Sequence, residues 1–220
     1  MDRVPGGHPA DLLTRILAIA DEVEEALYED ALHELKPDLI LSAGDLPFEY
    51  LENLVTRAGV PLLYVPGNHD PDVQFRRNTY GPVVVEEPIP GPQGCENVDG
   101  KVLNIDGLRV AGLGGSVRYR EGPNQYTQAG MRRRALGLEL RSHLRGRPDV
   151  LLTHAPPRGL GDGEDPPHYG FEAFHRLLRV LRPRFLVHGH LHPYGRPRAD
   201  RQVGDTLLVN AVPHRLLELG

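Results

Sequence analysis

The chain has very little cysteine and no long apolar run. Its single cysteine, Cys95, cannot form an intramolecular disulfide, which indicates a reducing compartment or a fold that does not depend on oxidation. The longest apolar segments, such as residues 39–43 and 150–153, are too short to cross a bilayer. Residues 1–8 lack the basic and apolar regions of a signal peptide. We therefore expect a cytoplasmic protein with no membrane partner.

An excess of positive charge is also missing. The formal net charge is −5 with neutral histidines, so the composition does not support nucleic acid as a partner. The length of 220 residues fits one domain, whose core needs no disulfide staple. We expect a single domain over residues 1–220, with residues 1–13 flexible. The oligomeric state is left open.

Apolar runs alternate with helical patterns in the first third of the chain. Residues 15–21, 38–45 and 61–70 are apolar runs that end in turn or polar residues. Amphipathic helical patterns over residues 24–35 and 50–57 separate them. This alternation predicts right-handed βαβ units, an α/β fold and a parallel sheet.

The rest of the chain continues with strands and two helices. Residues 82–115 are rich in Val, Gly and Pro, and residues 98–101 have the pattern of a hairpin turn between two strands. Residues 131–145 and 171–181 have helical periods. Met131, Ala135, Leu138 and Leu144 are expected on one face of the first of these helices. Strand-like runs cover residues 149–154, 185–188 and 206–210.

Side chains that can bind metal follow five of the predicted strands. They are Asp21, Asp45, the group Asn68, His69 and Asp70, then His154, and finally His190 and His192. A single Asp or His at such a place is usually structural. Because the carboxyl ends of parallel strands meet at one edge of a sheet, the five groups can converge. Carboxylate, imidazole and amide donors without thiolate suit Zn, Mn or Fe in a hydrolytic centre.

Four of these groups lie in motifs that occur together in a known family. The motifs are Gly44-Asp45, Gly67-Asn68-His69-Asp70, Thr153-His154 and Gly189-His190-Leu191-His192. In this order they resemble four of the five core blocks of the calcineurin-like metallophosphoesterases. The resemblance covers most of the chain and is greatest to the small, single-domain members. It implies a four-layer sandwich of two mixed β-sheets flanked by helices.

The resemblance also implies a ligand set for one or two divalent ions. Asp45 would bridge two ions, and the other ligands divide between them: Asn68, His154 and His190 for one, and Asp21 and His192 for the other. Two ions about 3.5–4 Å apart can generate a hydroxide nucleophile and stabilise an in-line displacement at phosphorus.

The residues implied to contact the substrate are fewer. His69 would lie over the phosphate, where it would either stabilise charge or protonate the leaving oxygen, with Asp70 orienting it and Asn68 close by. His168 precedes the helical pattern at 171–181, where small family members often carry a histidine near the substrate. We interpret His188 as a residue that supports the ligands or belongs to the core, not as a ligand, and we leave open whether His214 touches the substrate.

The first family block departs from its pattern. The family has Asp, any residue, then His, whereas this chain has Asp21-Glu22-Val23. Three readings follow: water fills the vacant place, only one ion binds, or another residue such as Glu22 or His8 substitutes. We rank the Glu22 substitution low, because alternation along a strand would turn its side chain away from that of Asp21.

The sequence therefore predicts a metal-dependent phosphoesterase acting on phosphodiesters or nucleotide-like substrates. A phosphomonoesterase with the same site is an alternative, since only the residues at the rim would differ. The other alternative is a non-catalytic binding or scaffold protein on the same fold, which Val23 favours.

Overall fold

A computed structural model describes residues 14–71, 76–80, 83–87, 91–192 and 199–220. The N-terminal segment 1–13, including His8, lies outside the described residues. The predicted flexibility of that segment and the substitution by His8 therefore stay predictions.

The first sheet has the strand order β15-β1-β2-β3-β6. The four strands that run parallel are β1 (Thr14–Ile19), β2 (Leu39–Ser42), β3 (Leu62–Tyr64) and β6 (Glu96–Asn97). The edge strand β15 (His214–Leu219) pairs antiparallel with β1. The three apolar runs predicted in the first third of the chain form the centre of this sheet.

The second sheet has the order β13-β14-β12-β11-β8-β7. Its parallel strands are β8 (Leu108–Leu113), β11 (Val150–Thr153), β12 (Phe185–His188) and β14 (Thr206–Asn210). The edge strands β7 (Val102–Ile105) and β13 (Arg201–Val203) run antiparallel. Both sheets are therefore mixed.

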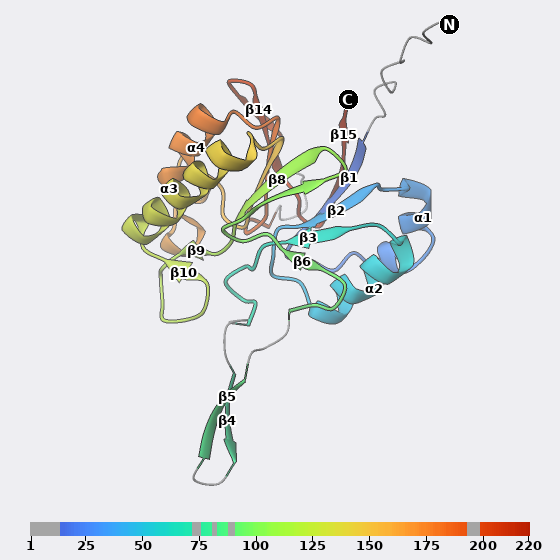
Figure 1. Cartoon of the computed structure of the whole chain (residues 1–220), viewed down its shortest axis with the longest axis horizontal. Helices are drawn as coiled ribbons and strands as arrows, with labels where there is room; N and C mark the ends of the chain where they lie inside the picture. The colour runs from blue at the N-terminus through green and yellow to red at the C-terminus, as the bar shows by residue number, and fades with distance from the viewer. Residues whose placement is uncertain (1–13, 72–75, 81–82, 88–90, 193–198) are drawn as a thin grey trace, which may run out of the picture.

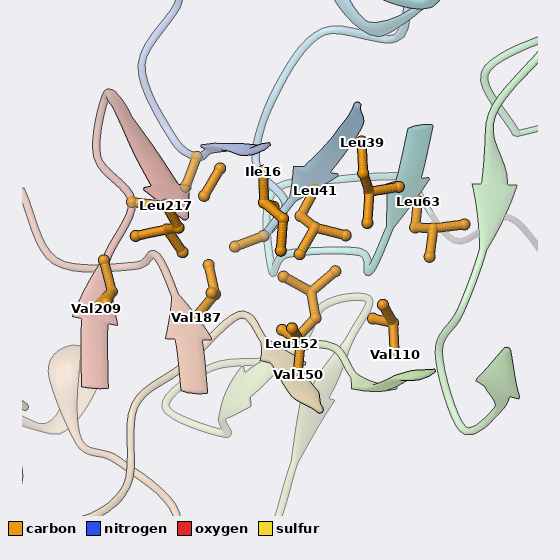
Figure 2. Close-up of a cluster of buried hydrophobic side chains, with 14 of the residues drawn as sticks. Ile16, Leu39, Leu41, Leu63, Val110, Val150, Leu152, Val187, Val209 and Leu217 are labelled. Atoms are coloured by element: carbon orange, nitrogen blue, oxygen red, sulfur yellow. The ribbon is translucent and has the colours of Figure 1, made fainter. Parts of the chain in front are cut away.

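The sheets pack face to face and carry helices on their outer faces (Figure 1). Figure 2 shows the core between them, where Leu41 and Leu63 of the first sheet meet Val110, Leu152 and Val187 of the second. The outer helices on one side are η1 (Glu25–Tyr28), α1 (Ala31–Leu35) and α2 (Phe48–Ala58). Those on the other are α3 (Gln128–Arg145) and α4 (Ala173–Leu181). The predicted four-layer α/β fold is confirmed.

Smaller elements complete the chain. The hairpin of β4 (Arg76–Tyr80) and β5 (Val83–Glu87) projects from the body of the molecule (Figure 1). The two-residue strands β9 (Ser116–Val117) and β10 (Gln125–Tyr126) pair with each other, and η2 (Pro166–His168) is a single turn. Among helices in the described part of the chain, none combines the length and apolarity needed to cross a membrane.

The helix expected over residues 24–35 is wrong as one element. It is divided into η1 and α1, because Glu29 takes a non-helical conformation with φ −105° and ψ −143°. Leu27 and Leu32 are both buried, yet five residues apart they would face different sides of a continuous helix. The break lets both side chains pack against the first sheet.

Two expectations for the second half also need correction. Residues 98–101 do form a turn, in which the Lys101 N–H donates to the Val98 carbonyl, but it joins β6 of the first sheet to β7 of the second. The hairpin turn lies instead at Asp106 and Gly107, between β7 and β8, where both residues have positive φ. On α3, Leu144 is 79% exposed, because thirteen residues of helix turn it away from Met131.

Candidate metal centre

The predicted ligands gather where the carboxyl edges of the two sheets meet. His154 follows β11 of the second sheet, and its Nδ1 lies 2.7 Å from the carbonyl oxygen of Ala43, just after β2 of the first. His190 follows β12, and its backbone N–H donates to Asp21 Oδ2 over 2.8 Å, just after β1. These bonds across the sandwich bring residues more than a hundred positions apart into one site.

Three of the side chains form a compact group. One ligand atom each from Asp45, His154 and His190 can be chosen so that all lie within 4.8 Å of one another. Asn68 joins them, with Oδ1 3.1 Å from His154 Nε2. Among the described residues, the buried Nδ2 of Asn68 has no hydrogen-bond partner. The structure therefore brings together the four side chains expected to share one ion.

The arrangement around His154 fits a cation. Because its Nδ1–H donates to the Ala43 carbonyl, Nε2 faces two acceptors, Asn68 Oδ1 and, at 3.3 Å, Asp45 Oδ2. Burial alone would lower the pKa of His154, but the charge of Asp45 overrides it and raises that pKa to about 9. Burial likewise opposes ionisation of Asp45, yet His154 brings the carboxyl pKa down to about 2. Without a metal ion, a proton on His154 supplies the positive charge that the acceptors require.

His190 is held differently. Its Nε2 lies 2.7 Å from the carbonyl oxygen of Pro167, so Nε2–H is the donor and Nδ1 is the nitrogen left for an ion. Burial, reinforced by the charge of His154, lowers the pKa of His190 to about 3. The ring is therefore neutral near pH 7 and can donate a lone pair. Its centroid lies 4.8 Å from that of His154.

The backbone at these ligands is strained. Asp21, Asp45 and His190 have φ of 60°, 58° and 67°, a left-handed region that non-glycine residues seldom occupy outside functional sites. The glycines of the motifs allow close approach. A Cβ on Gly67 would lie 2.0 Å from Asp45 Oδ1, and one on Gly189 would lie 2.2 Å from Asp21 Oδ2.

Asp70 joins two loops of the site. Its Oδ2 accepts the backbone N–H groups of Asp45 at 2.9 Å and Gly67 at 2.7 Å. Burial raises the pKa of this carboxyl, and the two N–H donors act against that effect. The predicted role of Asp70 in orienting His69 stays a prediction. His69 itself is exposed, and its backbone N–H donates to Asp45 Oδ1 over 2.7 Å.

The ligands predicted for the other ion differ in their exposure. Burial, with the charge of Asp45, raises the pKa of Asp21 to about 6 although His154 opposes this. His192 is 40% exposed, and its Nδ1 lies 2.6 Å from Glu22 Oε1. Asp21 and His192 stand outside the compact group that the described residues form around Asp45.

The loop after β1 differs from the expectation. β1 ends at Ile19, and the Glu22 N–H donates to the Ala20 carbonyl over 2.6 Å, so strand alternation no longer applies at this point. The Glu22 carboxylate contacts His192, one of the predicted ligands, so strand alternation does not decide where this side chain points. Val23 instead packs against the apolar cluster under α2.

Three further histidines that the sequence analysis considered occupy distinct positions. His168 lies beside the centre, with its ring centroid 5.7 Å from that of His190 and its Nδ1 2.8 Å from both carboxylate oxygens of Asp165. His188 is buried, as expected for a core residue. His214 Nδ1 lies 3.3 Å from Glu24 Oε2.

Sequence reasoning missed the groups that hold the imidazoles. The carbonyls of Ala43 and Pro167 carry no side-chain signal, so no sequence pattern identifies them. Asp165, three residues before His168, was available as a local signal. The direction of Glu22 depends on the turn at Asp21, which a strand pattern does not reveal.

Comparisons with known proteins identify the family of this chain. A family model described as calcineurin-like phosphoesterase matches residues 11–194. "Uncharacterized protein MJ1162" of Methanocaldococcus jannaschii is 26% identical over 199 residues, which cover 83% of this chain and 82% of that protein. The crystal structure of TT1561 of Thermus thermophilus aligns over 91% of this chain and 89% of the other, with 19% identity and a TM-score of 0.62. A further crystal structure, 17% identical, aligns over 94% and 95% of the two chains with a TM-score of 0.66. The two structures share the fold, and the match to the family model shows that this chain belongs to the calcineurin-like phosphoesterases.

Proposed function

We propose that this chain is a metal-dependent hydrolase of phosphodiesters or nucleotide-like substrates, with Mn, Zn or Fe as its ion. One observation carries the proposal. His154 Nε2 faces the oxygen atoms of Asp45 and Asn68, while the backbone N–H of the exposed His69 donates to Asp45 beside them. A metal site next to an exposed acid–base residue can activate water and protonate a leaving oxygen, which are two steps of phosphoester hydrolysis.

A divalent ion at this site supplies Lewis-acid polarisation of a phosphoryl oxygen and activation of water. Asp45, Asn68, His154 and His190 would hold one ion, and Asp45, Asp21 and His192 a second. The carbonyls of Ala43 and Pro167 fix which ring nitrogen of His154 and His190 faces inward. The ligands are thus positioned before any ion or substrate arrives.

Two histidines are suited to act on the substrate. His69 is exposed, and the bond from its backbone N–H to Asp45 Oδ1 ties its position to the ion site. It can donate a proton to the leaving oxygen. His168 is held by Asp165 next to His190, where it can donate a hydrogen bond to a phosphoryl oxygen.

A non-catalytic binding role is the second candidate, favoured by Val23. Because that side chain packs into the apolar cluster, a second ion would have three protein ligands instead of four. Three ligands with open positions still fit a catalytic metal site. The cytoplasmic location expected from the sequence stays a prediction.

The test compares wild type with His69→Ala after metal removal and reloading with Mn, Zn, Fe or Mg. Model substrates are bis(4-nitrophenyl) phosphate and 4-nitrophenyl phosphate, and bound metal is measured in parallel. We expect hydrolysis of the diester, and a loss of roughly 10²–10⁴-fold in turnover for His69→Ala with unchanged metal content. The loss should be smaller for substrates with better leaving groups.

His143→Ala serves as the matched control, because His143 is exposed on α3 and contacts Glu139. A preference for the monoester would favour the phosphomonoesterase alternative. No hydrolysis by the metal-loaded wild type would support the binding role, and loss of metal in His69→Ala would make His69 a ligand.

A further inference from the structure

The exposed side of the metal centre contains a carboxylate that the family motif does not include. Glu22 Oε1 lies 2.6 Å from His192 Nδ1, and the two side chains are 45% and 40% exposed. The turn at Asp21, with φ 60°, brings Glu22 to this position. The same turn sends Val23 into the apolar cluster, so Glu22 and not residue 23 faces the last histidine of the Gly-His-x-His block.

We propose that Glu22 is a positioning residue for the second ion, the one expected at Asp21, Asp45 and His192. This inference rests on the proposed metal centre. By accepting the Nδ1–H of His192, the Glu22 carboxylate fixes the ring so that Nε2 is the nitrogen turned toward the ion. Histidines that bind metals commonly donate their other N–H to a carboxylate or carbonyl, which orients the ring and makes it a stronger ligand.

The other two imidazoles of the centre supply an internal comparison. His154 and His190 donate to the neutral carbonyls of Ala43 and Pro167, and both rings are buried. The His192 side chain is more exposed, so a charged acceptor restricts a ring that packing holds less firmly. A carboxylate also increases the basicity of the imidazole more than a carbonyl does. The absence of a histidine at position 23 removes one ligand and so weakens binding of the second ion. Glu22 offsets part of that loss of affinity.

The experiment measures Mn²⁺ binding to the metal-free protein by calorimetry and by the electron paramagnetic resonance of free Mn²⁺. We expect two binding steps in wild type, with the weaker one assigned to the Glu22 side. Glu22→Ala should weaken that step by about 10-fold, the lower end of the range for outer-shell partners, because the pair is exposed. Glu22→Gln, whose amide oxygen can still accept the Nδ1–H, should lose less. Glu25→Ala, which removes the same charge from an exposed site on η1, should bind as wild type.

A double-mutant cycle with His192→Ala separates positioning from direct ligation. If Glu22 acts through His192, Glu22→Ala has no further effect on Mn²⁺ affinity in the His192→Ala background. An undiminished effect there would make Glu22 a direct ligand and overturn the proposal. A single binding step in wild type, or wild-type affinity in Glu22→Ala, would also overturn it. None of these readouts involves catalysis, so a protein that binds two ions but hydrolyses nothing would refute the proposed function and leave the role of Glu22 intact.

Discussion

The metal-free protein should lose stability as the pH rises from about 6.5 to 9, because of the buried pair His154 and Asp45. His154 is fully buried, and the charge of Asp45 raises its pKa from 6.5 to about 9. A raised pKa in the folded state means that folding favours protonated His154. The resulting stabilisation is fully present below pH 6.5 and is lost as the pH passes through about 9.

The size of this loss follows from the pKa difference. The step from 6.5 to about 9 corresponds to a decrease of about 3 kcal/mol in the free energy of unfolding. Asp45 does not oppose it in this interval, since its pKa of about 2 leaves it ionised throughout. Measurements should stop near pH 9, because burial also raises the pKa of Cys95 from 9.0 to about 11 and adds a separate loss above that pH.

The assay is urea denaturation of protein treated with EDTA at pH 6.5, 7.5, 8.5 and 9. Asp45→Asn removes the charge that causes the shift, so its unfolding free energy should be nearly constant over this interval. Wild type reloaded with metal should also lack the His154-dependent loss, because the ion takes the place of the proton. A flat profile for metal-free wild type would show that His154 is neutral, and would refute the assignment of Nε2 to a cation site.

Three further predictions concern single substitutions. Asp45→Asn should weaken metal binding by more than the 10–100-fold typical of outer-shell partners, since Asp45 would touch both ions; metal analysis after dialysis checks this. Gly67→Ala should also reduce metal binding, because the new Cβ would lie 2.0 Å from Asp45 Oδ1. Calorimetric titration against wild type measures this, and unchanged affinity would mean that the loop relaxes freely. Val23→His should leave metal stoichiometry unchanged, because residue 23 packs into an apolar cluster. The same change should lower the free energy of unfolding by about 1–2 kcal/mol. A gain in Mn²⁺ affinity would contradict this placement of residue 23.

The fold was largely predictable because its strands are buried and short. Both sheets are parallel at their centres, so apolar runs ending in polar residues mark the strands and place their carboxyl ends at one edge. That edge holds Asp45, Asn68, His154 and His190 together as expected. The turn between β7 and β8 was also predictable, because Asp106-Gly107 is a dipeptide typical of tight hairpin turns. The hairpin expected at residues 98–101 was wrong, because the turn there joins the two sheets.

Other features depend on tertiary contacts that no local pattern encodes. The split of residues 24–35 into η1 and α1 reflects the need to bury both Leu27 and Leu32 against one sheet. Glu22 follows the positive φ of Asp21, a residue whose carboxylate accepts the His190 N–H. This contact joins residues 169 positions apart, so no local sequence pattern contains it.

The two proposed ion positions would depend on the fold to different degrees. At the buried position, His154 bridges the sheets through Ala43, so a change there alters packing and ligation together. At the exposed position, Glu22 and His192 contact each other at the surface, where substitutions seldom change stability by more than about 0.5 kcal/mol. Ligation at the second position can therefore change while the fold persists. A motif that lacks one histidine, as this one does at Val23, is compatible with an intact core and an intact first ion site.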